Sequence, residues 1–250
     1  MKFSNLADHM QRIESTSKRL EMIDITKELF LDASENEMSW ICYILLGTLG
    51  PDYAGIEIGM AERLVLRSIA KAAGTNELAV EHKLREKGDL GEAAFELLKS
   101  RKIHRLVSRE ITVSDCYNSV LALSRLSGKK SIMQKIEGLA SLLVDMSPKE
   151  GKYLVRYVTG ELRLGLAEMT LLDALSEAFA GGKGARQEVE AVFNIRPDIA
   201  QIALVLKKQG LKGLKRIKIQ VGTPVRMELA ERLGSATEIA EKVGLPCAVE

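Results

Sequence analysis

Apolar residues recur at helical spacing along almost the whole chain before residue 217, and this pattern constrains the fold more than any other feature of the sequence. No segment in that range alternates with the period of a strand over a useful length. We therefore predict an all-α, multi-helix fold with about a dozen helices. The expected helices are a first amphipathic segment marked by Ile13, Leu20, Ile23, Leu29 and Phe30, then 39–49, 61–73, one from Thr75 to Gly88, one that begins at Asp89, 114–126, 131–146, 149–158, 166–180, 185–193 and 198–209.

The pattern changes near residue 217. Residues 217–221 alternate like a strand, 222–224 (Gly-Thr-Pro) form a break, and Ser235 begins a capping box that predicts a short final helix. The chain then stops in an apolar stretch, 247–250, that has nothing to pair with. We expect a piece of a longer chain, with a helical domain over 1–217 and the start of a second domain over 218–250.

Composition excludes several classes of protein. The hydrophobic share of 46% supplies a sizeable core and rules out general disorder. The longest uncharged run, 38–51, is shorter than the ~20 apolar residues of a membrane span, and the N-terminus lacks the apolar region of a signal peptide. The three cysteines and three histidines are scattered, so we predict no disulfide framework and no metal site. These features favour a cytoplasmic protein. If it binds DNA, we expect it to be associated with the nucleoid.

The near-neutral net charge of +2 conceals two basic blocks. Residues 101–135 hold eight basic and two acidic residues, and 207–218 hold six basic residues and no acidic one. Two basic blocks on an otherwise acidic chain are typical of a surface that binds a polyanion, although solvated helix faces would have the same charge pattern. Aromatic residues make up only 4% of the chain, which leaves few platforms for stacking single-stranded bases, so a duplex backbone is the favoured polyanion.

Two segments fit the chemistry of phosphate binding. Lys129, Lys130 and Ser131 precede a helix, with Lys135 one turn inside it, so cations, a hydroxyl and exposed amides can converge there. In the segment 159–165, Gly160 and Gly165 permit close approach of a sugar-phosphate chain, and Arg163 between them can enter a minor groove. The glycine-rich segment 181–184 is better interpreted as a plain loop.

The motifs of familiar active sites are missing. The sequence from Gly128 to Ser131 lacks the upstream glycine and the preceding strand of a phosphate loop. There is no G-x-S-x-G, no H-E-x-x-H and no supported Cys/His pair. Glu161 and Glu168 flank the arginine segment, where solvated carboxylates are the ordinary interpretation. We predict no catalytic residue and no cofactor site in this chain.

The segments 141–168, and above all Gly160-Glu-Leu-Arg-Leu-Gly-Leu-Ala-Glu168, resemble the DNA-binding domain of ATP-dependent DNA ligases of the archaeal and eukaryotic replicative type. Further similarity lies in 16–22, 57–61, 86–91 and 126–136. Residues 221–226 and 229–230 are similar to the entry of the adenylation domain, although Met227-Glu228 replaces the usual Pro-Met. Residues 248–250 resemble those before the K-x-D-G motif, so we expect a ligase piece cut before the lysine that takes AMP.

The resemblance implies an intact enzyme that seals nicks in replication and repair with ATP and Mg²⁺. It implies that the helical domain grips the minor groove and phosphate backbone of double-stranded, nicked DNA without reading sequence. The DNA contacts that it implies are Lys129, Lys130, Ser131, Lys135, Gly160, Arg163 and Gly165.

A sliding clamp is a further partner that the resemblance implies for the intact enzyme. The loop over 99–110 lacks the glutamine and paired aromatic residues of the clamp motif of archaeal relatives, so we do not expect clamp binding through it. Two other functions stay open on the sequence alone. One is a helical protein-interaction scaffold whose basic patches dock an acidic protein, and the other is a self-sufficient enzyme.

Overall fold

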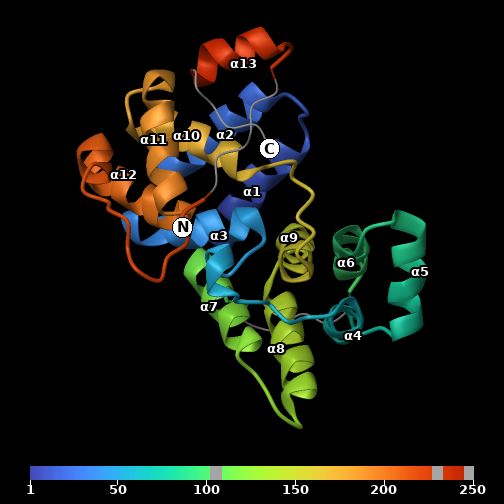
Figure 1. Cartoon of the computed structure of the whole chain (residues 1–250). Helices are drawn as coiled ribbons and strands as arrows, with labels where there is room; N and C mark the ends of the chain where they lie inside the picture. The colour runs from blue at the N-terminus through green and yellow to red at the C-terminus, as the bar shows by residue number, and fades with distance from the viewer. Residues whose placement is uncertain (102–108, 227–232, 245–250) are drawn as a thin grey trace.

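The computed structural model describes residues 1–101, 109–226 and 233–244, and its regular structure there is helical, which confirms the predicted all-α class (Figure 1). One isolated antiparallel bridge joins Lys2 to Thr112. In these ranges thirteen α-helices follow one another: α1 Phe3–Glu14, α2 Arg19–Asp32, α3 Met38–Leu46, α4 Glu62–Ala73, α5 Glu77–Lys87, α6 Leu90–Lys99, α7 Val113–Ser124, α8 Ser131–Asp145, α9 Pro148–Thr159, α10 Glu168–Phe179, α11 Arg186–Ile195, α12 Ile199–Leu214 and α13 Ala236–Val243.

Local capping chemistry explains where many of these helices begin and end. The Asp89 side chain accepts the Glu92 N–H at the start of α6, and Ser235 accepts the Glu238 N–H at the start of α13, as predicted. Left-handed glycines close four helices, because glycine adopts a positive φ without a Cβ clash. They are Gly47, Gly74, Gly88 and Gly160.

Several predicted elements differ from the structure. The first amphipathic segment is two helices, α1 and α2, separated by residues 15–18. Helix α3 ends at Gly47 and not at residue 49, since the backbone of Gly47 already has φ 73°. Residues 217–220 have no regular secondary structure. Helix α12 contains a break at Gly210, where φ is 56°, directly after the predicted end at residue 209.

The helices pack in two groups that share one core. Helices α4, α5, α6, α8 and α9 contact one another on one side, and α2, α3, α10, α11 and α12 do so on the other (Figure 1). Helices α1 and α7 contact members of both groups, and the buried apolar residues form one continuous cluster. Helices α7 and α8 run down to a tip, where residues 125–130 connect them (Figure 1).

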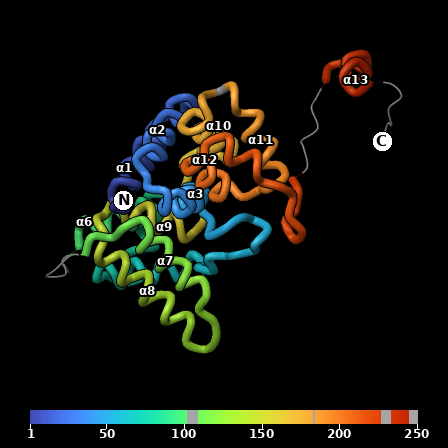
Figure 2. The backbone as a smooth tube through the Cα atoms, turned by 90° about the vertical axis from the view of Figure 1, so that its left-hand side faces the viewer, coloured from blue at the N-terminus to red at the C-terminus, as the bar shows by residue number. Residues whose placement is uncertain are grey.

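The C-terminal part has little contact with this core. Helix α13 buries none of its residues, and Figure 2 shows it apart from the other helices. The predicted division at residue 217 stays a prediction. The apolar stretch at 247–250 and most of the 99–110 loop, on which the clamp-motif prediction depends, lie outside the described residues. Of the three cysteines, Cys42 and Cys116 are free and buried, and burial raises the pKa of both thiols.

Where the structure describes the chain, no helix combines the length and the apolar character that crossing a membrane requires.

Candidate nucleic-acid interface

The loop between α9 and α10 presents one arginine on a fixed backbone. Leu162 and Leu164 are buried, while Glu161 and Arg163 between and beside them are exposed. Arg163 has φ 54°, and it is the only non-glycine residue with a positive φ among the described residues. A side chain in this conformation costs about 1–2 kcal/mol. The two leucine anchors therefore hold the arginine outward in a strained but defined position.

Glycines bracket this arginine, as the sequence predicted. Gly160 closes α9 with φ 73°, and the Glu161 N–H donates to the Arg156 carbonyl at 2.9 Å, as in a Schellman motif. Gly165 has φ 67°. A Cβ added at Gly160 would meet nothing within 4 Å, so the outer surface of this turn is open to an approaching chain. The glycine is required there by its backbone conformation and not by crowding.

The guanidinium of Arg163 contacts three groups of the protein. Its Nε lies 3.3 Å from Asp89 Oδ2, Nη1 donates to the Gly88 carbonyl at 3.2 Å, and Nη2 donates to Glu161 Oε2 at 3.0 Å. The side chain is nevertheless 49% exposed. The predicted groove-binding arginine is therefore paired with carboxylates in the free protein, and a polyanion would compete with them.

A buried ionic network stands behind Arg163. The side chain of Asp89 is 7% exposed, and Arg156 Nε lies 3.1 and 3.2 Å from its two oxygens. Arg156 also binds Glu14 at 2.9 Å, which joins α9 to α1. Burial opposes the charge of Glu14, but hydrogen bonds from Tyr153, Lys152 and Arg156 outweigh it, so the pKa of Glu14 is lowered. This network of ion pairs links α1, α6 and α9 behind the arginine loop.

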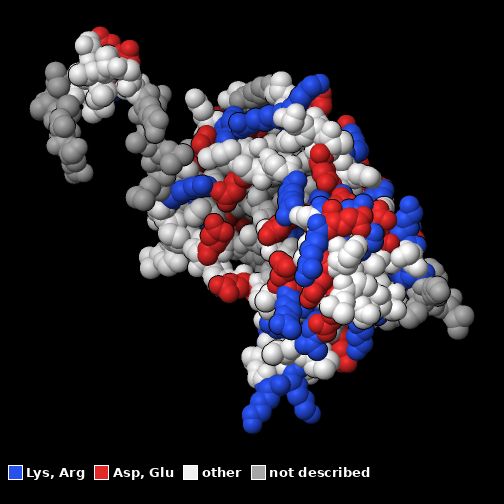
Figure 3. All heavy atoms as spheres, turned by 90° about the vertical axis from the view of Figure 1, so that its right-hand side faces the viewer, with Lys and Arg blue, Asp and Glu red and all other residues white. Residues whose placement is uncertain are grey.

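The start of α8 presents unpaired cations. Lys129 and Lys130 are exposed, and no carboxylate of the described residues lies within ion-pair distance of either. The N-cap residue Lys130 provides no capping side chain, so first-turn N–H groups of α8 have no such partner. The Ser131 hydroxyl donates to the Gly128 carbonyl at 2.8 Å, which leaves its oxygen as an acceptor. Figure 3 shows basic side chains projecting from this lower tip.

Residues 47–61 lead from α3 to α4, and we call them the bridging segment. Lys135 connects α8 to this segment, because its Nζ donates to the Gly59 carbonyl at 3.0 Å. Two tyrosine hydroxyls fix the other end of this segment: Tyr157 donates to the Thr48 carbonyl at 2.9 Å and Tyr117 to that of Leu49 at 2.6 Å. The bridging segment is thus tied both to α8 and to α9.

The bridging segment also passes beside the arginine loop. A Cβ added at Gly47 would lie 3.7 Å from Leu162 Cδ1 and 3.8 Å from the Gly160 Cα. Met60 and Ala61 line a hollow of about 340 Å³ together with Arg163. The predicted residues of the arginine loop and of the α8 start therefore belong to one continuous surface, which runs through a segment that the site prediction left out.

The two basic blocks do not act as single patches. In the first block, Arg101 donates to the Leu143 and Met146 carbonyls at the C-terminal end of α8, and Arg109 pairs with Asp115 at 2.8 Å. Only part of this block, at the α7–α8 tip, is unpaired among the described residues. That part comprises Arg125, Lys129 and Lys130. Lys135, one turn inside α8, donates instead to the Gly59 carbonyl.

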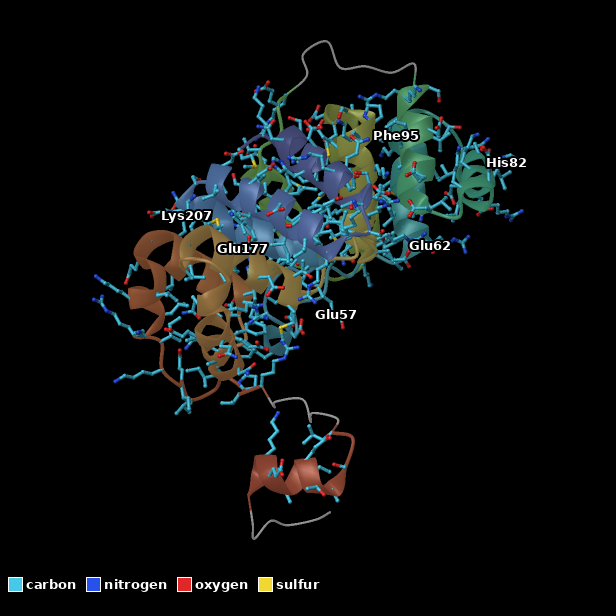
Figure 4. The ribbon with its side chains drawn as sticks, turned by 90° about the horizontal axis from the view of Figure 1, so that it is seen from above. Glu57, Glu62, His82, Phe95, Glu177 and Lys207 are labelled. Carbon is cyan, nitrogen blue, oxygen red and sulfur yellow. The ribbon has the colours of Figure 1, made fainter. Side chains whose placement is uncertain are left out.

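The second basic block lies elsewhere and is partly structural. Lys207 donates to the Phe30 and Leu31 carbonyls at the end of α2, and Lys208 and Lys215 pair with acidic side chains. Figure 4 shows Lys207 and Glu62, the first residue of α4, on opposite sides of the helical body. The block from 207 to 218 is therefore not part of the surface that carries Arg163.

Sequence reasoning missed Asp89 as a partner of Arg163 and the bridging segment as part of the surface. Asp89 had a signal of its own, the helix start with Glu92, which predicted a cap and nothing more. The bridging segment carried Gly55 and Gly59, both of positive φ, in a stretch without helical periodicity. Neither signal indicates which residues, distant in the sequence, Asp89 or the bridging segment will contact.

Comparison with known proteins gives consistent matches. Residues 2–176 match a family model described as DNA ligase N terminus. Over its full length the chain is 43% identical to a probable DNA ligase of Dictyoglomus thermophilum and 37% identical to a DNA ligase of Cenarchaeum symbiosum. A protein of Thermofilum pendens named DNA ligase 2 is 42% identical over 99% of the chain. Each match covers 42% of the relative, so the chain spans less than half the length of these proteins.

Proposed function

The chain belongs to the DNA ligase N-terminal family, and on that premise we propose that it binds double-stranded DNA, nicked DNA included, without regard to base sequence. The binding surface consists of the arginine loop (160–165), the bridging segment (47–61) and the α8 start (127–135). Its DNA contacts are Lys129, Lys130, Ser131, Lys135, Gly160, Arg163 and Gly165. A domain that must act at any nick should bind phosphates and groove shape and not base edges.

The observation that carries this proposal is the continuity of the surface between two features that suit phosphate. One is an outward arginine between two glycines of positive φ, of which Gly160 is open on its outer surface, and the other is a helix start with unpaired lysines. The Lys135–Gly59 contact and the shared hollow at Met60 and Ala61 connect them. A surface that presents cations at two connected places suits a duplex, whose charges are spread along its length.

The intact protein, by this proposal, seals nicks in DNA during replication and repair, and it uses ATP and Mg²⁺. Across the described residues no group of three or more histidine, cysteine or carboxylate side chains comes together to hold a metal ion. ATP and Mg²⁺ would act in a second domain that residues 218–250 begin and that continues in the part of the relatives' length that the chain does not span.

A salt titration of duplex binding tests the proposal. The chain is mixed with labelled nicked duplexes of several unrelated sequences, and affinity is measured by fluorescence anisotropy between low and physiological salt. If five to eight phosphates are neutralised, log affinity falls against log salt with a slope of roughly −4 to −7, equally for all sequences. Salt-independent binding, or no binding at low salt, would remove the proposal.

Two controls separate this function from the alternatives. An acidic polypeptide competes strongly with DNA if the chain is a docking scaffold for acidic proteins, and only weakly if the surface is shaped for a duplex. Incubation with labelled ATP leaves no covalent AMP on the chain if it has no active site of its own. A labelled adduct would identify a self-sufficient enzyme.

A further inference from the structure

Two carboxylates contact Arg163, and the protein holds them very differently. Asp89 is 7% exposed and makes three further contacts: it accepts the Glu92 N–H at 2.7 Å and faces Arg156 Nε through both oxygens. Glu161 is 62% exposed, and its contact with Arg163 Nη2 joins two residues of the same loop. An ion pair of this exposed kind is weak and easily exchanged.

Asp89 cannot follow a moving arginine. Its partner Arg156 is itself fixed by Glu14, and α6 and α9 are in close contact at Gly91, where an added Cβ would lie 2.7 Å from Arg156 Cγ. A carboxylate anchored in this way defines where the Nε edge of Arg163 lies. Because a guanidinium is planar and rigid, fixing Nε also fixes the direction of the two Nη atoms.

The two Nη atoms of Arg163 contact one backbone acceptor and one exposed carboxylate. Nη1 is on the Gly88 carbonyl at 3.2 Å, and Nη2 is on the exposed Glu161 at 3.0 Å. A guanidinium has five N–H groups, so N–H groups remain for a second acceptor. A phosphate oxygen can replace Glu161 at Nη2 while the contact between Nε and Asp89 is kept.

We propose that Asp89 is a positioning residue that orients Arg163 toward a DNA phosphate, and that Glu161 occupies the phosphate's position in the free protein. This inference rests on the proposed DNA-binding function and adds that Asp89 and Glu161 have different roles toward Arg163. Two acidic residues on one arginine have opposite effects on affinity, although each carries the same charge.

The test compares variants that each remove one negative charge. Asp89→Asn keeps an N-cap acceptor for α6 but loses the ionic contact, and nicked-duplex affinity is expected to fall about tenfold, on the order of one lost phosphate contact. Glu161→Gln is expected to raise affinity about two- to fivefold, which corresponds to the free energy of an exposed ion pair.

Glu28→Gln is the matched control, because Glu28 is 54% exposed and pairs with Arg12. Its affinity should equal that of the unsubstituted chain.

A double variant separates positioning from a general structural role. In an Arg163→Ala background, Asp89→Asn is expected to cause no further loss of affinity, since it acts through that arginine. If Asp89→Asn weakens both backgrounds equally, its role is structural and the proposal is wrong. If Asp89→Asn raises affinity as Glu161→Gln does, only charge matters, and the proposal is equally wrong. Glu161→Gln with unchanged or lower affinity also overturns it.

Arg163→Lys keeps the test decisive if Asp89→Asn does not fold. Lysine retains the charge but cannot hold Asp89 and a phosphate through two edges of one plane, so its affinity is expected to match that of Arg163→Ala. Affinity equal to that of arginine would contradict the proposal. Failure of the unsubstituted chain to bind duplex at all would instead contradict the proposed function.

Discussion

At the scale of single residues, Arg163 combines strain with incomplete pairing. It holds a positive φ that arginine disfavours, and it stays half exposed beside two carboxylates. Strained residues persist where the surrounding structure fixes them, and they are frequent at binding sites. Here Leu162 and Leu164 fix the backbone on both sides. The conformational free-energy cost of this backbone is consistent with a residue whose side chain contacts a binding partner.

Replacing this arginine should weaken DNA binding without affecting sequence preference. Arg163→Ala is expected to lower duplex affinity about tenfold on every sequence and to reduce the salt slope by about one, because one phosphate contact is lost. Anisotropy titrations on unrelated duplexes measure both quantities. Arg12→Ala is a matched control, since Arg12 is 48% exposed and pairs with Glu28. A loss confined to some sequences would indicate base readout and contradict this account.

Gly160, the first residue of the arginine loop, should be needed for stability. Gly160→Ala is expected to lower the free energy of unfolding by about 1–2 kcal/mol, since φ is 73° and the added methyl group meets no neighbour that could compensate. Urea denaturation measures the change.

Gly184→Ala provides the comparison for this glycine. Gly184 also has open space around a Cβ but lacks a positive φ, so its replacement should leave stability equal or slightly higher. Equal losses in the two variants would mean that backbone conformation is not the cause.

The local part of the site was predictable because its signals lie within a few residues of one another. Gly160, Arg163 and Gly165 lie within six consecutive residues of one loop, and Lys129 and Lys130 directly precede α8. The contact of Arg163 with Gly88 joins residues 75 apart in the sequence. Such a pairing depends on how α6 packs on α9. Hydrophobic periodicity indicates which face of a helix is buried, but it does not indicate which other helix packs against that face.

At the scale of elements, helix ends were predicted well where glycine or a capping side chain marks them. Gly74 and Gly88 close α4 and α5, and Asp89 begins α6. The separation of α1 from α2 was missed because residues 15–18 contain neither glycine nor proline. The early end of α3 was missed because Gly47 competes with Gly50 as a stop signal, and the buried neighbours of the turn favour the first.

The α8 start should contribute charge to binding and little to stability. The double variant Lys129→Gln with Lys130→Gln is expected to reduce the salt slope of duplex binding by about two. The free energy of unfolding should stay within about 0.5 kcal/mol, because neither side chain is buried or paired among the described residues.

A second double variant is the control for position. Lys208→Gln with Lys215→Gln removes two exposed cations, one in α12 and one at its C-cap, that pair with Glu35 and Glu188. Since α12 is not part of the proposed surface, the salt slope should not change. An equal reduction in both double variants would mean that charge acts without regard to place, and that the α8 start is not a specific contact.

At the scale of the whole molecule, the ionic network of α1, α6 and α9 should make stability depend on acid. The pKa of Glu14 is lowered from its ordinary 4.5, against the effect of burial, by hydrogen bonds from Tyr153, Lys152 and Arg156. The unfolded chain therefore takes up this proton more readily than the folded one. The stabilisation is complete above about pH 4.5 and is lost as the pH falls through the lowered folded value.

Urea midpoints measured from pH 7 down to pH 3 test this dependence. The midpoint should fall below pH 4.5, and the fall should be smaller for Glu14→Gln, which has no carboxyl group to protonate at this position. Glu14→Gln is also less stable at pH 7, so the comparison is of slopes and not of absolute values. An identical fall in both proteins would exclude Glu14 as a cause.

The central claim is that the arginine loop, the bridging segment and the α8 start form one surface for duplex DNA. Amide hydrogen exchange of the chain with and without nicked duplex tests it most directly. We predict that DNA slows exchange in 160–165, 47–61 and 127–135 together, while α12 and the rest of the body are unchanged. Protection confined to 207–218, or to one of the three segments alone, would contradict the claim.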